Sequence, residues 1–220
     1  MSSMNRITIV IFALTGIAVH AQKKLPSVSP YENDFQSAEP GLLPEGIMEI
    51  DGVFKVTKGE GDKQFLVMEN EPLSENAVIL GPSLKGAASV SAKIRSFRKR
   101  RSYPRFAVGL HGISGFRLRV VPSKGVVELV KNEESVKAIP YKWKHDEWTV
   151  LQLDIAPDGE DWRVDGRVWH VSEERPEKPT VTLKHKGSPG QGKASLWGTA
   201  YSGHEIQFDD VRVRPVPLGS

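Results

Sequence analysis

Apolar and polar residues alternate along the middle of this chain, between Pro104 and His170. Five segments carry Val, Leu, Ile, Phe or Trp at every second position, and a Gly, Pro, Asn or Asp turn closes each of them: PRFAVGLHG, GFRLRVV, GVVELVK, EWTVLQLDI and DWRVDGRVWH. Alternation with a period of two is typical of strands that bury one face. A turn about every ten residues is typical of an antiparallel sandwich or barrel.

Similar segments lie on both sides of this region. GVFKVT and QFLVME are joined by a hairpin turn at Gly59–Asp62, and a Gly-Pro turn follows NAVIL. The remaining segments with this pattern are ASVSAKIRSF, TVTLKH, ASLWGTAY and EIQFDDVRVRP. The total is roughly twelve to fourteen strands, which suits a jelly roll of two packed sheets. We therefore predict an all-β, antiparallel two-sheet jelly-roll sandwich over residues 31–216.

The first residues have the features of an export signal. Arg6 supplies a positive charge, Ile7 to Val19 is apolar, and Val19 and Ala21 are small residues at the positions that a signal peptidase reads. The apolar stretch is shorter than the roughly twenty residues that a membrane-spanning helix needs. We expect a signal peptide over 1–21, a flexible leader over 22–30 and a secreted or periplasmic protein without membrane insertion.

Composition narrows the chemistry. The chain has no cysteine, which excludes disulfides, thiol nucleophiles and thiolate metal sites. The formal net charge is +3 and falls by one when Arg6 is removed, so any basic patch has to be local. Arg98–Arg101 is such a patch. Because export argues against a nuclear address, we interpret it as a solvated loop beside a sugar-binding face and expect no nucleic-acid partner.

Three parts of the chain resemble a known superfamily. The opening DFQSAEPGLLPEGI, the central PRFAVGLHGISGFRLRV and the closing ASLWGTAYSGHEIQFDDVRV are similar to the concanavalin A-like lectin/glucanase superfamily, and more narrowly to laminin-G-like domains of secreted bacterial proteins. The resemblance covers nearly the whole chain after the signal. It implies a concanavalin A-like jelly roll. Because the superfamily contains glucanases, polysaccharide lyases, lectins and carbohydrate-binding modules, it leaves the function open.

The sequence does not contain the catalytic patterns of that superfamily. Its glucanases carry Glu-X-Asp-X-X-Glu on one strand, because retaining hydrolysis needs two carboxylates roughly 5 Å apart. Here Glu133 and Glu134 are adjacent, so on a strand they would face opposite ways. No lyase motif surrounds His111, and no histidine spacing indicates zinc. A lyase or hydrolase of another branch is one alternative function, and a structural or protein-interaction module of the cell envelope is another.

Strand parity predicts a sugar-binding face. If the apolar residues of each segment face the core, the opposite positions include Arg105, His111, Arg117, Arg119, Arg163, Arg167 and Trp197. Guanidinium groups bind carboxylate, sulfate or hydroxyl groups through paired hydrogen bonds, and an indole ring packs on the apolar face of a sugar. We predict that these residues line one groove for a carbohydrate, with anionic polysaccharides among the candidates. The alternative is a solvated face of Arg–Asp and Arg–Glu pairs.

Calcium is a candidate cofactor, and the resemblance suggests where it would bind. In that superfamily the first and last strands pair, and a carboxylate from each can hold a hard cation. Asp34, Asp209 and Asp210 occupy the matching places. The alternative is that Asp34 caps a turn while the Asp pair marks a β-bulge, because the apolar residues around that pair face the core together only across a bulge.

Overall fold

The computed structural model describes residues 29–71 and 74–216. These residues form fifteen strands and two short 3₁₀ helices, η1 (Glu60–Asp62) and η2 (Pro122–Lys124). The predicted signal peptide over 1–21 and nearly all of the predicted leader over 22–30 lie outside the described residues.

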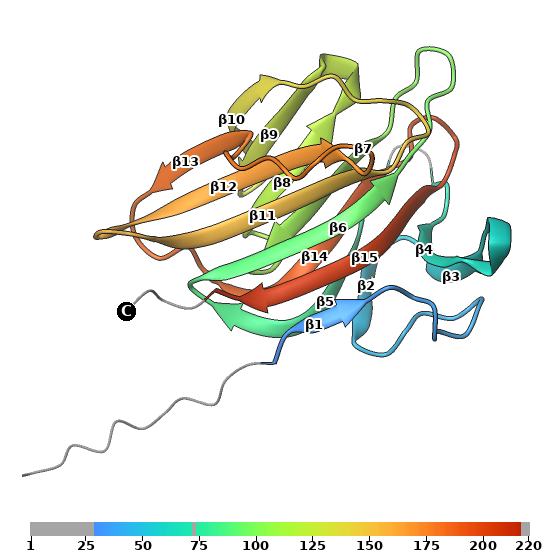
Figure 1. The fold of residues 1–220 in the computed structure, drawn as a ribbon, viewed down its shortest axis with the longest axis horizontal. Coiled ribbons are helices and arrows are strands. Elements are labelled where there is room, and N and C mark those ends of the chain that lie inside the picture. The colour runs from blue at the N-terminus through green and yellow to red at the C-terminus, as the bar shows by residue number, and fades with distance from the viewer. Residues whose placement is uncertain (1–28, 72–73, 217–220) are drawn as a thin grey trace, which may run out of the picture.

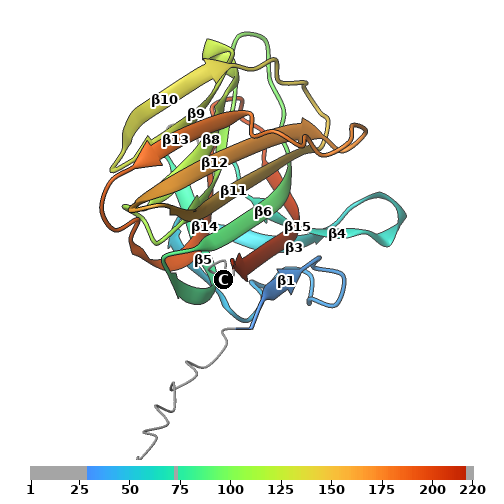
Figure 2. The same cartoon turned by 60° about the vertical axis from the view of Figure 1, so that its left-hand side comes forward.

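The strands form two antiparallel sheets that pack face to face (Figures 1 and 2). Sheet A contains β1 (Tyr31–Asn33), β3 (Phe54–Lys58), β4 (Gln64–Met68), β6 (Ala88–Arg95), β11 (Thr149–Asp158), β12 (Asp161–His170), β13 (Val181–His185) and β15 (Ile206–Pro215). Its order is β13-β12-β11-β6-β15-β4-β3, and β1 also pairs with β15. The predicted all-β sandwich is therefore confirmed.

The second sheet supplies the other half of the sandwich. Sheet B contains β2 (Ile47–Asp51), β5 (Asn76–Lys85), β7 (Arg105–Leu110), β8 (Phe116–Val121), β9 (Val126–Lys131), β10 (Glu134–Pro140) and β14 (Gln191–Thr199). Its order is β10-β9-β8-β7-β14-β5-β2. All five segments of the central alternating region are strands, three in sheet B and two in sheet A.

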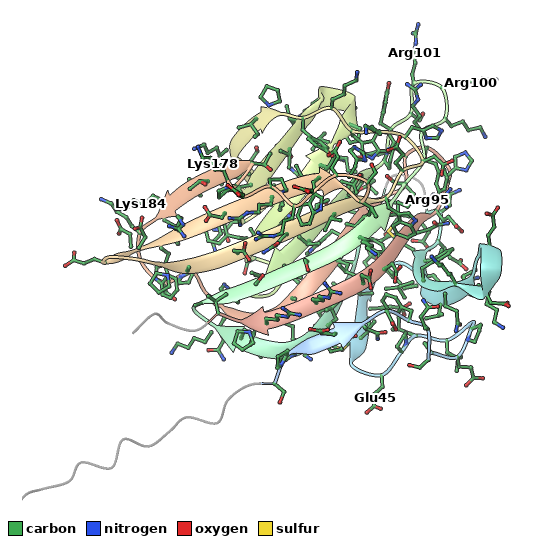
Figure 3. The ribbon with its side chains drawn as sticks, viewed as in Figure 1. Glu45, Arg95, Arg100, Arg101, Lys178 and Lys184 are labelled. Atoms are coloured by element: carbon green, nitrogen blue, oxygen red, sulfur yellow. The ribbon has the colours of Figure 1, made fainter. Side chains whose placement is uncertain are left out.

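Alternate residues of the facing strands fill the space between the sheets. Phe106 and Val108 of β7 are buried against sheet A, and Leu151 and Leu153 of β11 are buried against sheet B. Each such side chain contributes roughly 1.5–3 kcal/mol of hydrophobic stabilisation. Charged side chains point outward, for example Glu45 before β2 and Lys184 on β13 (Figure 3). The division into inner and outer faces predicted from the alternation is therefore confirmed.

Two strands differ from the sequence-based expectation. Glu134–Pro140 is not among the predicted strands, but it forms β10 at the edge of sheet B, where nearly all of its side chains are exposed. The Gly-Pro pair after NAVIL does not end that strand. Instead, β5 continues to Lys85, Gly81 takes a positive φ of 68°, and the pairing with β14 shifts register. An edge position and a bulge each accommodate residues that are unfavourable within a regular strand.

The last strand contains a bulge, which was the alternative interpretation of Asp209 and Asp210. The pairing of β15 with β6 shifts register between Asp209 and Arg212, and Asp210 has a positive φ of 47°. Phe208 and Val211 are both fully buried as a result. Across residues 29–71 and 74–216, we find no helix with the length and apolar character required to cross a membrane.

Candidate functional site

The predicted sugar-binding residues lie on two opposite faces of the molecule. Sheet B carries Arg105 on β7, Arg117 and Arg119 on β8, and Trp197 on β14, whereas sheet A carries Arg163 and Arg167 on β12. The prediction that they line one groove is therefore wrong. Alternation distinguishes inside from outside, but a sandwich has two outer faces, and the core separates them.

On sheet B, Arg117 and Trp197 are occupied by other protein groups. Arg117 is 1% exposed, and its Nη1 lies 3.1 Å from Glu75 Oε2, while Nη2 pairs with Glu133. Its guanidinium carbon lies 4.1 Å from the centroid of the Trp197 ring. The Trp197 indole donates a hydrogen bond to Ser195 Oγ at 2.7 Å. Neither side chain is open to a ligand in this arrangement.

The other arginines of sheet B are also engaged. Arg119 Nε lies 2.7 Å from Glu128 Oε1, and Glu128 is buried. Arg105 donates to Tyr201 Oη and stacks over that ring, 4.8 Å from its centroid. The alternative interpretation, paired arginines and acids, therefore describes this face, although the Arg117 guanidinium and the Arg119–Glu128 pair are buried rather than solvated.

His111 does not face outward. It follows β7 with a positive φ of 66°, is 4% exposed, and its Nδ1 lies 3.2 Å from the carbonyl oxygen of Pro189. Burial holds the pKa of its imidazole below the usual value. It is a buried residue at the end of a strand and lines no part of the groove described next.

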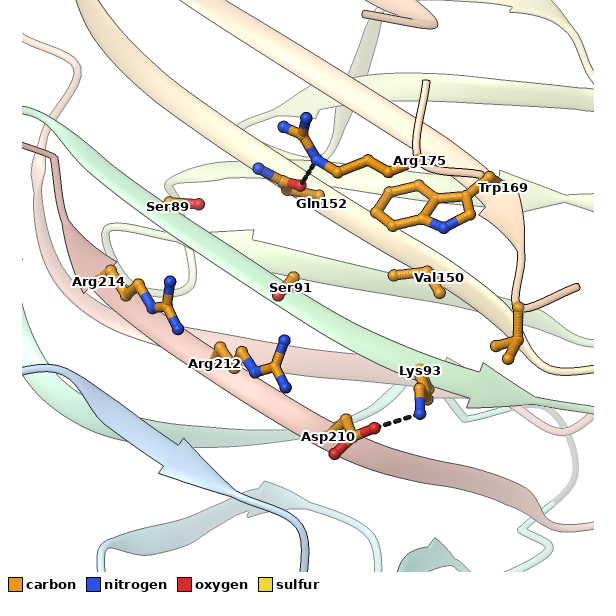
Figure 4. A pocket seen from close by; sticks show the side chains of 11 residues that line it. Ser89, Ser91, Lys93, Val150, Gln152, Trp169, Arg175, Asp210, Arg212 and Arg214 are labelled. Atoms are coloured by element: carbon orange, nitrogen blue, oxygen red, sulfur yellow. Dashed lines mark hydrogen bonds and ion pairs between the residues drawn. The ribbon is translucent and has the colours of Figure 1, made fainter. Parts of the chain in front are cut away.

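The outer face of sheet A carries a groove of about 580 Å³ (Figure 4). The residues that line it are Ser89, Ser91, Lys93, Val150, Gln152, Trp169, Val171, Arg175, Asp210, Arg212 and Arg214. The serines lie on β6, which runs between β15 and β11. Neighbouring strands are about 4.8 Å apart, so a row of short side chains between rows of long ones leaves a trough.

The two walls of the groove differ in chemistry. Arg212 and Arg214 of β15 form one wall, while Trp169 of β12 and Gln152 of β11 belong to the other, as Figure 4 shows. Arg175, from the loop after β12, donates from Nε to Gln152 Oε1 at 2.8 Å. A ring is thus placed opposite guanidinium groups across a floor of hydroxyls.

The guanidinium groups of β15 are weakly held. Arg212 Nε lies 4.0 Å from Glu32 Oε2, and Arg214 pairs with the same carboxylate. All three side chains are about half exposed, and exposed pairs of this kind contribute well under about 1 kcal/mol. An anionic ligand can therefore replace Glu32 at little cost.

Positive charge exceeds negative charge around the groove. The cations on its walls are Lys93, Arg175, Arg212 and Arg214. Within the described residues, the carboxylates that pair with them are Asp210, which pairs with Lys93, and Glu32. The groove therefore keeps a positive excess that favours an anion.

Arg163 and Arg167 lie on the same outer face as the groove but do not line it. Arg163 Nε is 2.9 Å from Asp165 Oδ2, and Arg167 Nη1 is 2.7 Å from Asp154 Oδ2. These predicted binding residues therefore balance acids of their own sheet.

Sequence reasoning missed most of the groove. The alternation of residues 88–95 places Ser89, Ser91 and Lys93 on one face, and this signal was present in the sequence. Arg212 and Arg214 alternate in the same way with the buried Val211 and Val213. The alternation also does not reveal that residues 88–95 pair with residues 206–215 on one side and residues 149–158 on the other.

The predicted calcium ligands do not form a metal site. Asp34 Oδ1 accepts a hydrogen bond from the Gln36 N–H at 3.1 Å, Asp209 Oδ1 accepts one from the Asp210 N–H at 2.7 Å, and Asp210 pairs with Lys93. Burial, together with the nearby carboxylates of Asp210 and Asp34, raises the pKa of Asp209. Among the described residues, no group of three or more acidic or histidine side chains is arranged to hold a metal. The turn cap and the bulge account for the conformation of these residues. Asp34 and Asp210 line one hollow of about 350 Å³ together with Glu32.

Comparisons with known proteins support the fold. No family model matches the sequence, and no curated protein matches it. Solved structures do match. A carbohydrate binding module from Bacillus subtilis aligns with 11% identity over 77% of this chain and 95% of the module, with a TM-score of 0.52. Lectin II from Ulex europaeus aligns with 8% identity over 86% of this chain and 98% of the lectin, with a TM-score of 0.56.

A further match is a Bacillus subtilis protein of unknown function with a galectin-like fold. It aligns with 9% identity over 86% of this chain and 96% of its own length, with a TM-score of 0.57. At these identities the likeness shows the fold alone, a lectin-like β-sandwich.

Proposed function

We propose that this protein binds carbohydrate in the groove of sheet A, and that the ligand carries carboxylate or sulfate groups. One observation carries the proposal. The ring of Trp169 and four cationic side chains surround a serine floor, and two carboxylates among the described residues oppose those cations.

The groove offers the contacts that a charged sugar needs. The indole of Trp169 can pack on the apolar face of a sugar ring. The guanidinium groups of Arg175, Arg212 and Arg214 can form paired hydrogen bonds with a carboxylate or sulfate. The volume of about 580 Å³ lies within the range of ordinary ligand sites. The carbohydrate binding module and the lectin named above show that sandwiches of this shape are used for sugars.

Calorimetric titration tests the proposal. Polygalacturonate and heparin serve as acidic probes and dextran as the neutral one. We expect an acidic probe to bind and dextran not to bind. Trp169→Ala should weaken binding about 30-fold, the effect of losing a contact worth about 2 kcal/mol. Arg212→Ala combined with Arg214→Ala should weaken it about tenfold or more.

Arg163→Ala is the matched control, because this arginine lies on the same outer face and outside the groove. It should bind as the unmodified protein does. Failure of both acidic probes to bind, or an equal loss in the control, would contradict the proposal.

The salt dependence of the affinity separates the contribution of the charged groups to binding from that of stacking on Trp169. The Debye length falls from about 10 Å at 0.1 M salt to about 3 Å at 1 M. We expect the affinity of the unmodified protein to fall over this range. The variant without Arg212 and Arg214 should show a flatter response, whereas Trp169→Ala should keep the original slope.

Export would bring this binding site to a polysaccharide outside the cytoplasm. We propose export from the sequence features of residues 1–21, namely Arg6, the apolar segment after it and the small residue Ala21. Mass spectrometry of the protein recovered from the host's envelope or medium should identify Gln22 as the first residue. Recovery of the full-length chain from the cytoplasm would contradict export.

A further inference from the structure

A second hollow lies at one end of the sandwich, where the loop between β6 and β7 meets the segment between β10 and β11. Its volume is about 420 Å³, and its lining combines aromatic rings with cations, including Arg98, Tyr103, Tyr141, Lys142, Trp143 and His145. Trp143 packs against Phe106 of the core, with ring centroids 6.5 Å apart. One wall of this end hollow is therefore anchored to the rigid interior.

Three cations line the end hollow, Arg98, Lys142 and Lys144, and of these Lys144 pairs with Glu147 and Glu173. Arg98 contacts Tyr103 Oη at 3.4 Å, and in the part of the chain that the structure describes neither Arg98 nor Lys142 forms an ion pair. Arg100 and Arg101 stand exposed in the loop after β6 (Figure 3) and are likewise without ion pairs among the described residues. The net charge of the chain is modest, so this concentration of positive charge is local.

The groove lies along β6, and the end hollow includes Arg98, three residues after that strand ends. Between them lies a third hollow of about 430 Å³, which shares Val171 with the groove. Its charged lining residues are Arg95, Asp146 and Glu147. Arg95 and Asp146 form an ion pair, and Asp146 is the neighbour of His145 in the end hollow. At about 3.3 Å per residue, β6 extends about 20 Å from Ser89 to Arg95.

We propose that one acidic polysaccharide chain runs along β6, from the groove to the end hollow, so that the natural ligand is a polymer rather than a free sugar or a chain end. This rests on the proposed function. Cations line the path at both ends, and both acids of the middle hollow have a cationic partner, Asp146 in Arg95 and Glu147 in Lys144. The stacking surface at the far end is Trp143, in the same role as Trp169 in the groove.

A polymer that reaches both sites gains affinity through effective concentration. Once one segment is bound in the groove, binding of the next segment at the end hollow is intramolecular, and linkage of this kind can raise affinity by factors of about 10²–10⁴. A ligand too short to leave the groove does not gain this increment.

The experiment compares the affinities of a long and a short ligand for a variant of each site and for a control. The end variant is Arg98→Ala with Lys142→Ala, and the groove variant is Arg212→Ala with Arg214→Ala. The control is Lys178→Ala with Lys184→Ala, which removes the same charge from exposed positions outside both hollows. The unmodified protein and the three variants are each titrated with two ligands. One is the acidic polysaccharide that binds the unmodified protein, polygalacturonate or heparin, and the other is the disaccharide of that polysaccharide. Thermal unfolding checks that each variant is folded.

We expect the polymer to bind at least about tenfold more tightly per binding site than the disaccharide. The end variant should lose that advantage and keep its affinity for the disaccharide, whereas the groove variant should weaken both. Restoring charge with Arg98→Lys and Lys142→Arg should recover polymer binding.

Three results would overturn the proposal. In the first, the end variant binds the polymer as the unmodified protein does. In the second, it loses both ligands equally. In the third, a single-stranded oligonucleotide binds the end hollow more tightly than the polysaccharide. If the groove variant keeps both ligands, the proposed function itself fails, and this outcome is distinct from the other three.

Discussion

Removing the two carboxylates around Arg117 should destabilise the fold more than removing Arg117 itself. Its guanidinium is almost completely buried between Glu75 and Glu133, against the ring of Trp197. In the double variant Glu75→Ala and Glu133→Ala, this charge stays buried without either partner. Breaking a buried pair in this direction costs about 3–5 kcal/mol, because a charge is left away from both water and its counter-ion.

The substitution Arg117→Met creates the opposite situation. The side chains of Glu75 and Glu133 are 29% and 59% exposed, so water can hydrate both carboxylates once the cation is gone. Methionine fills much of the same space and keeps contact with Trp197. The losses are a cation–π contact of about 1 kcal/mol and two partly exposed pairs. We therefore expect a destabilisation below about 2 kcal/mol.

Thermal unfolding followed by circular dichroism measures the difference. For a protein of this size, 1 kcal/mol corresponds to about 2–4 °C. The double glutamate variant should unfold about 10 °C lower than the unmodified protein, and Arg117→Met within about 5 °C of it. As a control, Glu45→Ala with Glu174→Ala removes two exposed carboxylates and should change little. Equal losses, or a larger loss for Arg117→Met, would refute the argument that desolvation of the guanidinium sets the cost.

Three further predictions concern packing, pH and metal. Gly166→Ala should destabilise the fold by about 1–3 kcal/mol, measured by urea unfolding. The added Cβ would clash with Leu118 across the core and lie 2.8 Å from Val181 Cγ1. An unchanged unfolding midpoint would show that the two sheets can separate at this position. Burial lowers the pKa values of His111 and His170 from 6.5, so below that pH the unfolded chain binds more protons than the folded protein does. The free energy of unfolding should therefore fall as the pH drops below about 6.5. His170→Gln should flatten this dependence in urea titrations at several pH values. The unfolding temperature should be the same in calcium and in chelator, because the carboxylates once expected to bind the ion are engaged in a turn cap, a bulge and an ion pair; a rise of several degrees with calcium would contradict this.

Strand identity and strand parity could be read from the sequence. Residues such as Val108 and Leu153 recur with period two, and burying one face of each strand is the main favourable term in forming a sandwich. The same rule gave a bulge at the Asp pair as one of two interpretations, because the apolar residues around it face the core together only if one extra residue is inserted, and the structure contains that bulge. It failed for β10, since an exposed edge strand buries too little to leave a pattern.

The sites were decided by tertiary structure. The predicted arginines do not line one groove because the alternation is the same on both outer faces of the sandwich. In the structure β8 belongs to one sheet and β12 to the other. The groove exists because β6, with its serines, lies between strands that are distant in sequence. Sequence alternation records whether a side chain faces water or core, which is a property of one strand. Which side chains meet across a face depends on strand order, and long-range pairing alone sets that order.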